Sequence, residues 1–174
     1  MNKQHIFVFG CTKTKLDNRS KLGTRPRILP ADLYGKSQLF RARLAYMERL
    51  AQQTGNPPTW CVISAKYGHV ASDRQIQWYE ETMRDMDAAD RAEWALTTAN
   101  HLISYCTEAW HADETSPRGK PTDLTFEIHA GSDYTRLLVP ILRSVGANVV
   151  LPVAGLGIGQ QLRWYSDKHA AVAA

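Results

Sequence analysis

Residues 147–162 read ANVVLPVAGLGIGQQL, an apolar run that breaks into three alternate glycines and then resumes with helical character. Asn148 to Val153 has the residue types and the length of a buried strand, and the glycines allow the backbone to turn sharply. Gln160 to Tyr165 then opens a helix whose free N–H groups would face the turn. Two interpretations of the loop stay open: it cradles the phosphate of a ligand, or its glycines only permit close packing of the helix on the strand.

The composition indicates one globular domain over residues 1–174. Hydrophobic residues make up 44% of the chain and charged residues 22%, so it can bury a core without metal or disulfide support. The net charge of +4 favours an acidic partner such as nucleic acid, although the excess is small.

The cysteines and the hydropathy pattern bear on the compartment. Cys11, Cys61 and Cys106 are odd in number and widely spaced, which argues against a disulfide framework and against a zinc site. No signal peptide is evident, and no apolar run has the length needed to cross a bilayer. We therefore expect a cytoplasmic protein with no membrane partner, and nothing in the sequence requires a metal or a cofactor.

Three further apolar runs resemble the first and alternate with amphipathic helices. Buried strands are predicted over His5–Gly10, Thr59–Ser64 and Leu124–His129. One helix is predicted to begin at a Ser37 cap and a second to cover Asp87–Cys106. This alternation predicts a three-layer α/β sandwich with a central, mostly parallel sheet of at least four strands.

Each predicted strand is followed by a polar loop. The four loops are CTKTK at 11–15, SAKYGH at 64–69, HAGSDY at 129–134 and GLGIGQQ at 155–161. The carboxyl ends of parallel strands meet at one edge of a sheet, which is where ligands bind in such folds. The first loop continues to residue 27 and carries six basic residues against one acid. It either tracks a phosphate backbone or is a solvated surface loop.

These segments resemble, in order, a bacterial and phage domain family of unknown function. The matching motifs are CTKTKLD, DLYGKSQLF, SAKYGH with the later YEETM, HAGSDY and GLGIGQQLRWY. The resemblance covers most of the chain outside residues 108–123. That family is similar to uracil-DNA-glycosylase-like α/β domains, including one found in archaeosine tRNA synthesis. It is also similar to the bacterial anti-phage glycosylases that remove glucosylated hydroxymethylcytosine from viral DNA.

The resemblance implies a uracil-DNA-glycosylase-like fold and a DNA glycosylase activity. The enzyme would flip out and excise a modified base of phage DNA, alpha-glucosyl-hydroxymethylcytosine above all, and leave an abasic site. The chain departs from the family pattern at His69, which replaces an aliphatic residue, at Trp78, which precedes Tyr79 where a proline is common, and in its longer basic loop. These departures lie where a substrate would bind.

Hydrolysis of an N-glycosidic bond passes through an oxocarbenium-like sugar, so it needs a carboxylate to hold water and donors to stabilise the departing base. Asp133 is the first candidate, because its strand-then-GSDY setting resembles the strand-then-GQDPY segment of uracil-DNA glycosylases, without the proline. Asp32 follows, then Asp73 and Glu80; each of them is alternatively a helix cap or a solvated acid. Lys66 is the candidate donor to the base, or a nucleophile that forms a Schiff base at C1′.

Further residues, most of them in the four loops, are predicted to contact the base or the DNA, with Tyr79 as an additional aromatic wall. They are Cys11, Lys13, Lys15, Tyr34, Tyr67, His69, Trp78, His129, Gly131, Tyr134, Gly155, Gly157, Gly159 and Gln161. Two other functions stay open: an enzyme acting on free nucleosides or nucleotides, such as a deoxyribosyltransferase, and a nucleic-acid-binding module without chemistry.

Overall fold

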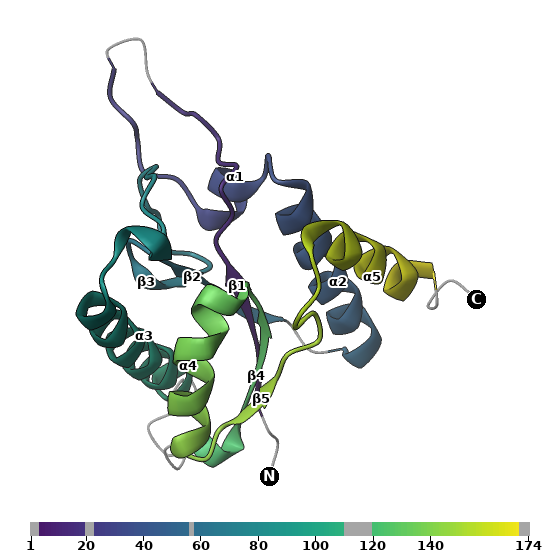
Figure 1. Cartoon of the computed structure of the whole chain (residues 1–174). Coiled ribbons are helices and arrows are strands. Elements are labelled where there is room, and N and C mark those ends of the chain that lie inside the picture. The colour runs from purple at the N-terminus through teal and green to yellow at the C-terminus, as the bar shows by residue number, and fades with distance from the viewer. Residues whose placement is uncertain (1–3, 20–22, 56–57, 110–119, 171–174) are drawn as a thin grey trace.

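The computed structural model describes residues 4–19, 23–55, 58–109 and 120–170, and in it five strands alternate with helices (Figure 1). The elements are β1 (Gln4–Gly10), α1 (Pro30–Tyr34), α2 (Gln38–Thr54), β2 (Thr59–Ser64), β3 (Gly68–Ala71), η1 (Met83–Asp85), α3 (Ala88–Ala109), η2 (Pro121–Asp123), β4 (Leu124–His129), α4 (Ser132–Ser144), β5 (Asn148–Val150) and α5 (Ile158–Ala170).

The strands form one sheet in the order β3-β2-β1-β4-β5. All neighbouring pairs are parallel except β2 and β3. The predicted mostly parallel sheet is thus confirmed, and β3 is an edge strand that the sequence did not reveal. Gly68 makes the reversal after β2 possible: its φ is +62°, and a Cβ there would lie 2.9 Å from the Thr98 hydroxyl of α3.

Helices cover both faces of the sheet, with α3 and α4 on one side and α2 and α5 on the other (Figure 1). Successive β1 side chains point to opposite faces: Ile6 and Val8 join the core under α3 and α4, whereas Phe7 and Phe9 pack towards α1 and α2. Burial on both faces explains why the strand is apolar without alternation. The three-layer α/β sandwich is the architecture that the sequence predicted.

Local signals set the helix ends. The Ser37 hydroxyl accepts a hydrogen bond from the Phe40 N–H at 3.3 Å and caps α2 as predicted, and Gly55 ends that helix with φ +69°. The apolar face of α3 is buried at Ala95, Ala99 and Leu102, whereas Leu96 is 56% exposed and Trp94 is buried. The Trp94 indole N–H donates to the Ser64 carbonyl at 2.9 Å, which fastens α3 to the end of β2.

The chain beyond β5 also differs from its prediction. β5 ends at Val150 and not at Val153, and residues 152–155 form a turn. Pro152 has no N–H to pair with a neighbouring strand, which is a sufficient reason for the strand to end early. α5 begins at Ile158, two residues before its predicted start.

The order of the strands places the topological switch at β1, which pairs with β2 on one side and with β4 on the other. Between β1 and β4 the edge is tightly closed, since a Cβ on Gly10 would lie 2.9 Å from the Ala130 Cβ. Open space at the carboxyl edge therefore lies over the β1 and β2 ends, and the long segment after β1 extends away from the sheet there (Figure 1).

Candidate functional site

An open cleft of about 820 Å³ lies at the carboxyl ends of β1 and β2. It is formed by the basic loop after β1, by Lys66 after β2 and by the segment that leads from β3 to η1. Its lining residues are Lys13, Lys15, Arg25, Lys66, Trp78, Tyr79, Glu80, Glu81, Thr82 and Asp85. Cations, aromatic rings and carboxylates thus meet in one space.

The cations of the cleft lie over its aromatic rings. The Arg25 guanidinium is 3.6 Å from the centre of the Trp78 ring, and the Lys15 ammonium is 4.3 Å from the centre of the Tyr79 ring. Such contacts hold each positive charge beside an apolar face. Burial lowers the pKa of Lys15, and the nearby Glu80 and Glu81 carboxylates act in the opposite direction.

Tyrosines and a cysteine lie behind the Tyr79 ring. The Tyr34 and Tyr79 hydroxyls are hydrogen-bonded at 2.6 Å, and the Cys11 thiol is 3.1 Å from the Tyr134 hydroxyl. Tyr67 packs edge-on against Tyr79 with ring centres 5.3 Å apart. Burial raises the pKa of Tyr34, Tyr79 and Tyr134, so these groups stay protonated and form a polar but neutral floor.

The three carboxylates of the cleft differ in their partners. Glu81 pairs with the Lys66 ammonium at 2.6 Å; this hydrogen bond raises the pKa of Lys66 and lowers that of Glu81. Asp85 accepts the Thr82 N–H at 2.6 Å and so caps η1. Within the described part of the chain, no hydrogen bond or ion pair engages the Glu80 carboxylate. Glu80 is therefore the acid that is available to a ligand.

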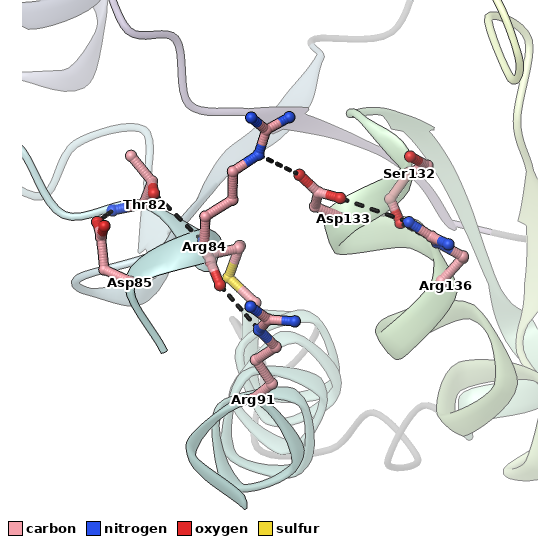
Figure 2. A network of polar contacts seen from close by, with 8 residues as sticks. Thr82, Arg84, Asp85, Arg91, Ser132, Asp133 and Arg136 are labelled. Carbon is pink, nitrogen blue, oxygen red and sulfur yellow. Dashed lines mark hydrogen bonds and ion pairs between the residues drawn. The ribbon is translucent and has the colours of Figure 1, made fainter. Parts of the chain in front are cut away.

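Asp133 lies outside the cleft lining, in a second hollow of about 330 Å³ on the other side of η1. Figure 2 shows its carboxylate between the Arg84 Nε at 3.7 Å and an Arg136 Nη at 3.5 Å. It is the second residue of α4, whose N-cap is Gly131, so it does not cap that helix itself. Asp32 is exposed on α1 and does not line the cleft either.

His69 faces the α3 side of the sheet. It is 7% exposed, its ring centre lies 4.8 Å from that of Tyr105, and its Nε2 is buried without a hydrogen-bond partner in the described structure. Burial, and then the charges of His101 and Arg74, lower its pKa to about 4. His69 therefore does not line the cleft with Trp78, and a contact between His69 and a base stays a prediction.

His129 is fully buried within a polar network. Its Nε2 lies 2.9 Å from Glu127 Oε1 and its Nδ1 lies 2.7 Å from the Tyr165 hydroxyl. Burial lowers the pKa of His129. Burial alone would raise the pKa of Glu127, but hydrogen bonds from His129 and His5 outweigh this effect and lower the pKa of Glu127 to about 2. A neutral His129 that donates from Nε2 to an ionised Glu127 and accepts from Tyr165 satisfies all these groups.

Arg43 connects this network to the end of β1. One Nη donates to the Gly10 carbonyl at 2.7 Å and the other to Gln161 Oε1 at 3.4 Å, and the guanidinium also hydrogen-bonds Tyr165. Neither Arg43 nor Glu127 was among the predicted site residues. The signal was present, because the alternation in LTFEIH puts Glu127 and His129 on one face of a buried strand.

The glycine loop lies beside the network and not among the residues that line the cleft. The Gln160 side chain accepts the Gly157 N–H at 2.9 Å, which is the pairing of an N3 glutamine with an N-cap. Gln161 Nε2 donates to the Leu156 carbonyl at 2.8 Å. The Gly157 N–H is thus engaged within the loop. A Cβ at Gly155 or Gly159 would meet no described atom within 4 Å, so close packing does not account for these two glycines, and a phosphate cradle at this loop stays a prediction.

The structure therefore divides the predicted site residues into three groups. Lys13, Lys15, Lys66 and Trp78 line the cleft, and Cys11, Tyr34, Tyr67 and Tyr134 lie behind it. The residues outside it are Asp32, His69, His129, Gly131, Asp133, Gly155, Gly157, Gly159 and Gln161. Arg25, which also lines the cleft, belongs to the basic loop for which phosphate contacts were one of two interpretations. Glu81, Thr82 and Asp85 line the cleft without having been proposed as contacts, because they come from an irregular segment that carries no periodic signal.

Within the described residues, no cluster of histidine, cysteine and acidic side chains is arranged to hold a metal ion. No helix in that part of the chain is long and apolar enough to cross a membrane.

Comparison with curated proteins and with solved structures gives no match. The model of a family of unknown function, DUF6884, matches residues 6–167. The match runs from β1 into α5 and includes every lining residue of the cleft. The chain therefore belongs to the family of unknown function DUF6884.

Proposed function

We propose that the protein is a DNA glycosylase that flips out and excises a modified base of phage DNA, in anti-phage defence in the cytoplasm. The observation that carries this proposal is the cleft, in which cations and aromatic rings surround an unengaged carboxylate. The choice of alpha-glucosyl-hydroxymethylcytosine as the base follows from the sequence resemblance. Three free cysteines fit a reducing compartment.

The cleft has the groups that binding of an extruded nucleotide requires. Lys13, Lys15, Arg25 and Lys66 provide positive charge for the phosphates. Trp78 and Tyr79 provide ring faces, and stacking of a base on an aromatic side chain contributes about 1–3 kcal/mol. That gain is comparable to the few kcal/mol that extrusion of a base costs. A volume of about 820 Å³ is large enough for a base with an attached hexose.

Glu80 is the acid that we assign to the chemical step. Its carboxylate would hold a water molecule whose oxygen forms the new bond to C1′ while the C1′–N bond breaks. The electron pair of that bond leaves with the base, and the proton released by the water neutralises the departing base. Lys15, whose ammonium lies near Glu80, would stabilise the negative charge that develops on the base.

A lysine nucleophile is the main chemical alternative. Lys66 is poorly suited, because its ion pair with Glu81 raises its pKa. Lys15 is the better candidate, since burial lowers its pKa. Borohydride treatment during turnover distinguishes the two mechanisms: direct hydrolysis gives no covalent protein–DNA adduct, whereas an adduct that Lys15→Arg abolishes would assign the nucleophile to Lys15.

The test of the proposed function compares three substrates in one assay. The protein is incubated with duplex DNA that contains glucosylated hydroxymethylcytosine, with unmodified duplex and with free nucleosides. We expect released base and alkali-labile sites from the modified duplex alone. Cleavage of free nucleosides alone would identify a nucleoside enzyme, and DNA binding without release from any substrate would identify a binding module; either outcome would overturn the proposal.

A further inference from the structure

Three arginines surround the hollow that contains Asp133. Its lining residues are Met83, Arg84, Arg91, Asp133, Arg136 and Leu137. Asp133 is the single acid among them, so the lining carries a formal excess of two positive charges. Figure 2 shows Arg84 from η1 and Arg136 from α4 approaching the carboxylate from opposite sides.

The ion pairs of Asp133 are easily broken. Arg84 is 86% exposed and Arg136 is 75% exposed, and their distances to the carboxylate, 3.7 and 3.5 Å, are long for charged partners. Exposed pairs of this kind change an equilibrium by less than about fivefold. Each arginine contacts only one oxygen of the Asp133 carboxylate, whereas a phosphate can accept two hydrogen bonds from a planar guanidinium. A phosphate can therefore replace Asp133 as the partner of both arginines at a small cost in free energy.

The backbone holds the hollow in a fixed position beside the cleft. Thr82 and Asp85 line the cleft, whereas Met83 and Arg84, between them in sequence, line the hollow. The turn is capped from both directions, because Asp85 accepts the Thr82 N–H and Thr82 accepts the Arg84 N–H at 3.2 Å. Arg91 Nε donates to the Met83 carbonyl at 2.9 Å and fastens the turn to α3.

We propose that this hollow is a phosphodiester-binding subsite for the DNA strand whose nucleotide occupies the cleft. One backbone phosphate binds between Arg84 and Arg136, and the Asp133 carboxylate withdraws from them. The choice of DNA as the polymer rests on the proposed function. The role of Asp133 is then to occupy the arginines in the free protein, and it takes no part in the chemistry.

The test uses the salt dependence of binding to a fluorescein-labelled, unmodified DNA duplex, followed by fluorescence anisotropy. Each phosphate contact contributes about 0.9 to the slope of log K against log salt concentration. The double variant Arg84→Gln/Arg136→Gln should lower that slope by about one. Arg163→Gln is the matched control, because Arg163 is 85% exposed and pairs with Asp167 at 3.8 Å on α5, on the opposite side of the sheet.

A slope that the double variant leaves at the wild-type value, or absence of DNA binding by the wild-type protein, would overturn the subsite. Base release on modified duplex is measured in the same preparations. If the wild type releases the base and the double variant keeps the wild-type salt slope, the subsite alone is rejected. If the double variant has a lower salt slope but the wild type releases no base, the glycosylase proposal alone is rejected.

Asp133→Asn gives an independent measurement. If the carboxylate only competes for the arginines, its removal should tighten DNA binding by up to about fivefold and leave the rate of base release at saturating DNA within about twofold of wild type. A fall of that rate by 10²- to 10⁴-fold, about the contribution of a general base, would show that Asp133 orients the water, and would overturn its assigned role.

Discussion

Two polar clusters lie at the carboxyl edge of the same sheet and differ in what covers them. The cleft over β1 and β2 is open, and the Glu80 carboxylate in it meets no partner among the described residues. The network around Glu127 and His129 is closed by α2 and α5, and hydrogen bonds engage Glu127, His129 and Tyr165 within it. The same kind of strand end has thus produced an open cleft in one place and a buried framework in the other.

The difference teaches how to interpret a polar residue at the end of a strand. A buried polar group costs free energy unless it is hydrogen-bonded. In the network, partners engage Glu127, His129 and the Tyr165 hydroxyl, and the Arg43 Nε is the buried atom without a partner among the described residues. In the cleft, by contrast, no hydrogen bond or ion pair engages the Glu80 carboxylate among the described residues, so it remains available. Four predictions test this contrast, from the largest expected effect to the smallest.

The largest effect is expected at Glu80. Glu80→Gln keeps the size of the side chain and removes the charge that would orient the water, so base release should fall by about 10²- to 10⁴-fold while DNA affinity changes little. Initial rates of base release on modified duplex measure this effect. Glu93→Gln, at an exposed position of α3, is the control. A variant with a wild-type rate would remove Glu80 from the chemistry.

In the closed network the expected effect is on stability. Arg43→Met keeps an apolar stem but removes the donor to the Gly10 carbonyl, Gln161 and Tyr165. Unpaired buried acceptors cost about 1–3 kcal/mol each, so the free energy of unfolding in urea should fall by about 3 kcal/mol. Arg41→Met, an exposed position on the same helix, should change it by less than about 1 kcal/mol. An unchanged urea midpoint for Arg43→Met would mean that the three acceptors find other partners when the guanidinium is removed.

The third prediction concerns the pH dependence of stability, to which the buried His69 should contribute. Its pKa is lowered to about 4 in the folded protein, whereas an unfolded chain protonates near 6.5. The unfolded state therefore binds more protons between these values, and stability should fall as pH falls from about 6.5 to 4, by about 2 kcal/mol at pH 5. His69→Phe should remove this part of the fall, and it also eliminates an unpaired buried nitrogen.

Urea unfolding at pH 7 and pH 5 checks this prediction. Wild type should lose more stability than His69→Phe over this interval. The loss below about pH 4.5, which reflects protonation of Glu127 with its pKa near 2, should persist in both proteins. Equal losses from pH 7 to pH 5 would show that His69 is not the sensitive group.

The smallest effect concerns the basic loop. Lys13 lines the cleft, whereas Arg19 lies outside its lining. Lys13→Ala should lower the slope of log K against log salt by about one, and Arg19→Ala should leave it unchanged. The measurement is anisotropy with labelled duplex. Equal changes in the two variants would mean that the whole loop, and not the cleft alone, follows the phosphate backbone.

The sequence predicted the elements and the class of fold, because these depend on local patterns. Apolar runs of strand length, separated by helical periodicity, are sufficient to indicate a mostly parallel sheet covered on both faces. Side-chain caps such as Ser37 and glycines such as Gly55 act over a few residues, and their positions were recognisable in the same way.

Other features depended on contacts between distant segments. β3 is four residues long and is fixed by its pairing with β2, so its own sequence carries little signal. Arg25 reaches the cleft only because its loop folds back over Trp78. Asp133 was singled out for its position after a strand, yet Arg84, 49 residues earlier in the chain, determines its surroundings.

By itself, then, the sequence determined the four parallel strands and that their polar ends share one edge. Only the tertiary structure decided which of those ends opens to solvent. The physical reason is that openness depends on what packs above each strand. Tyr165 of α5 covers His129 at the end of β4, while the segment from Trp78 to Asp85 lies beside the β1 and β2 ends and leaves a cleft. Side chains of similar chemistry consequently lie in a buried network at one end and in an open cleft at the other.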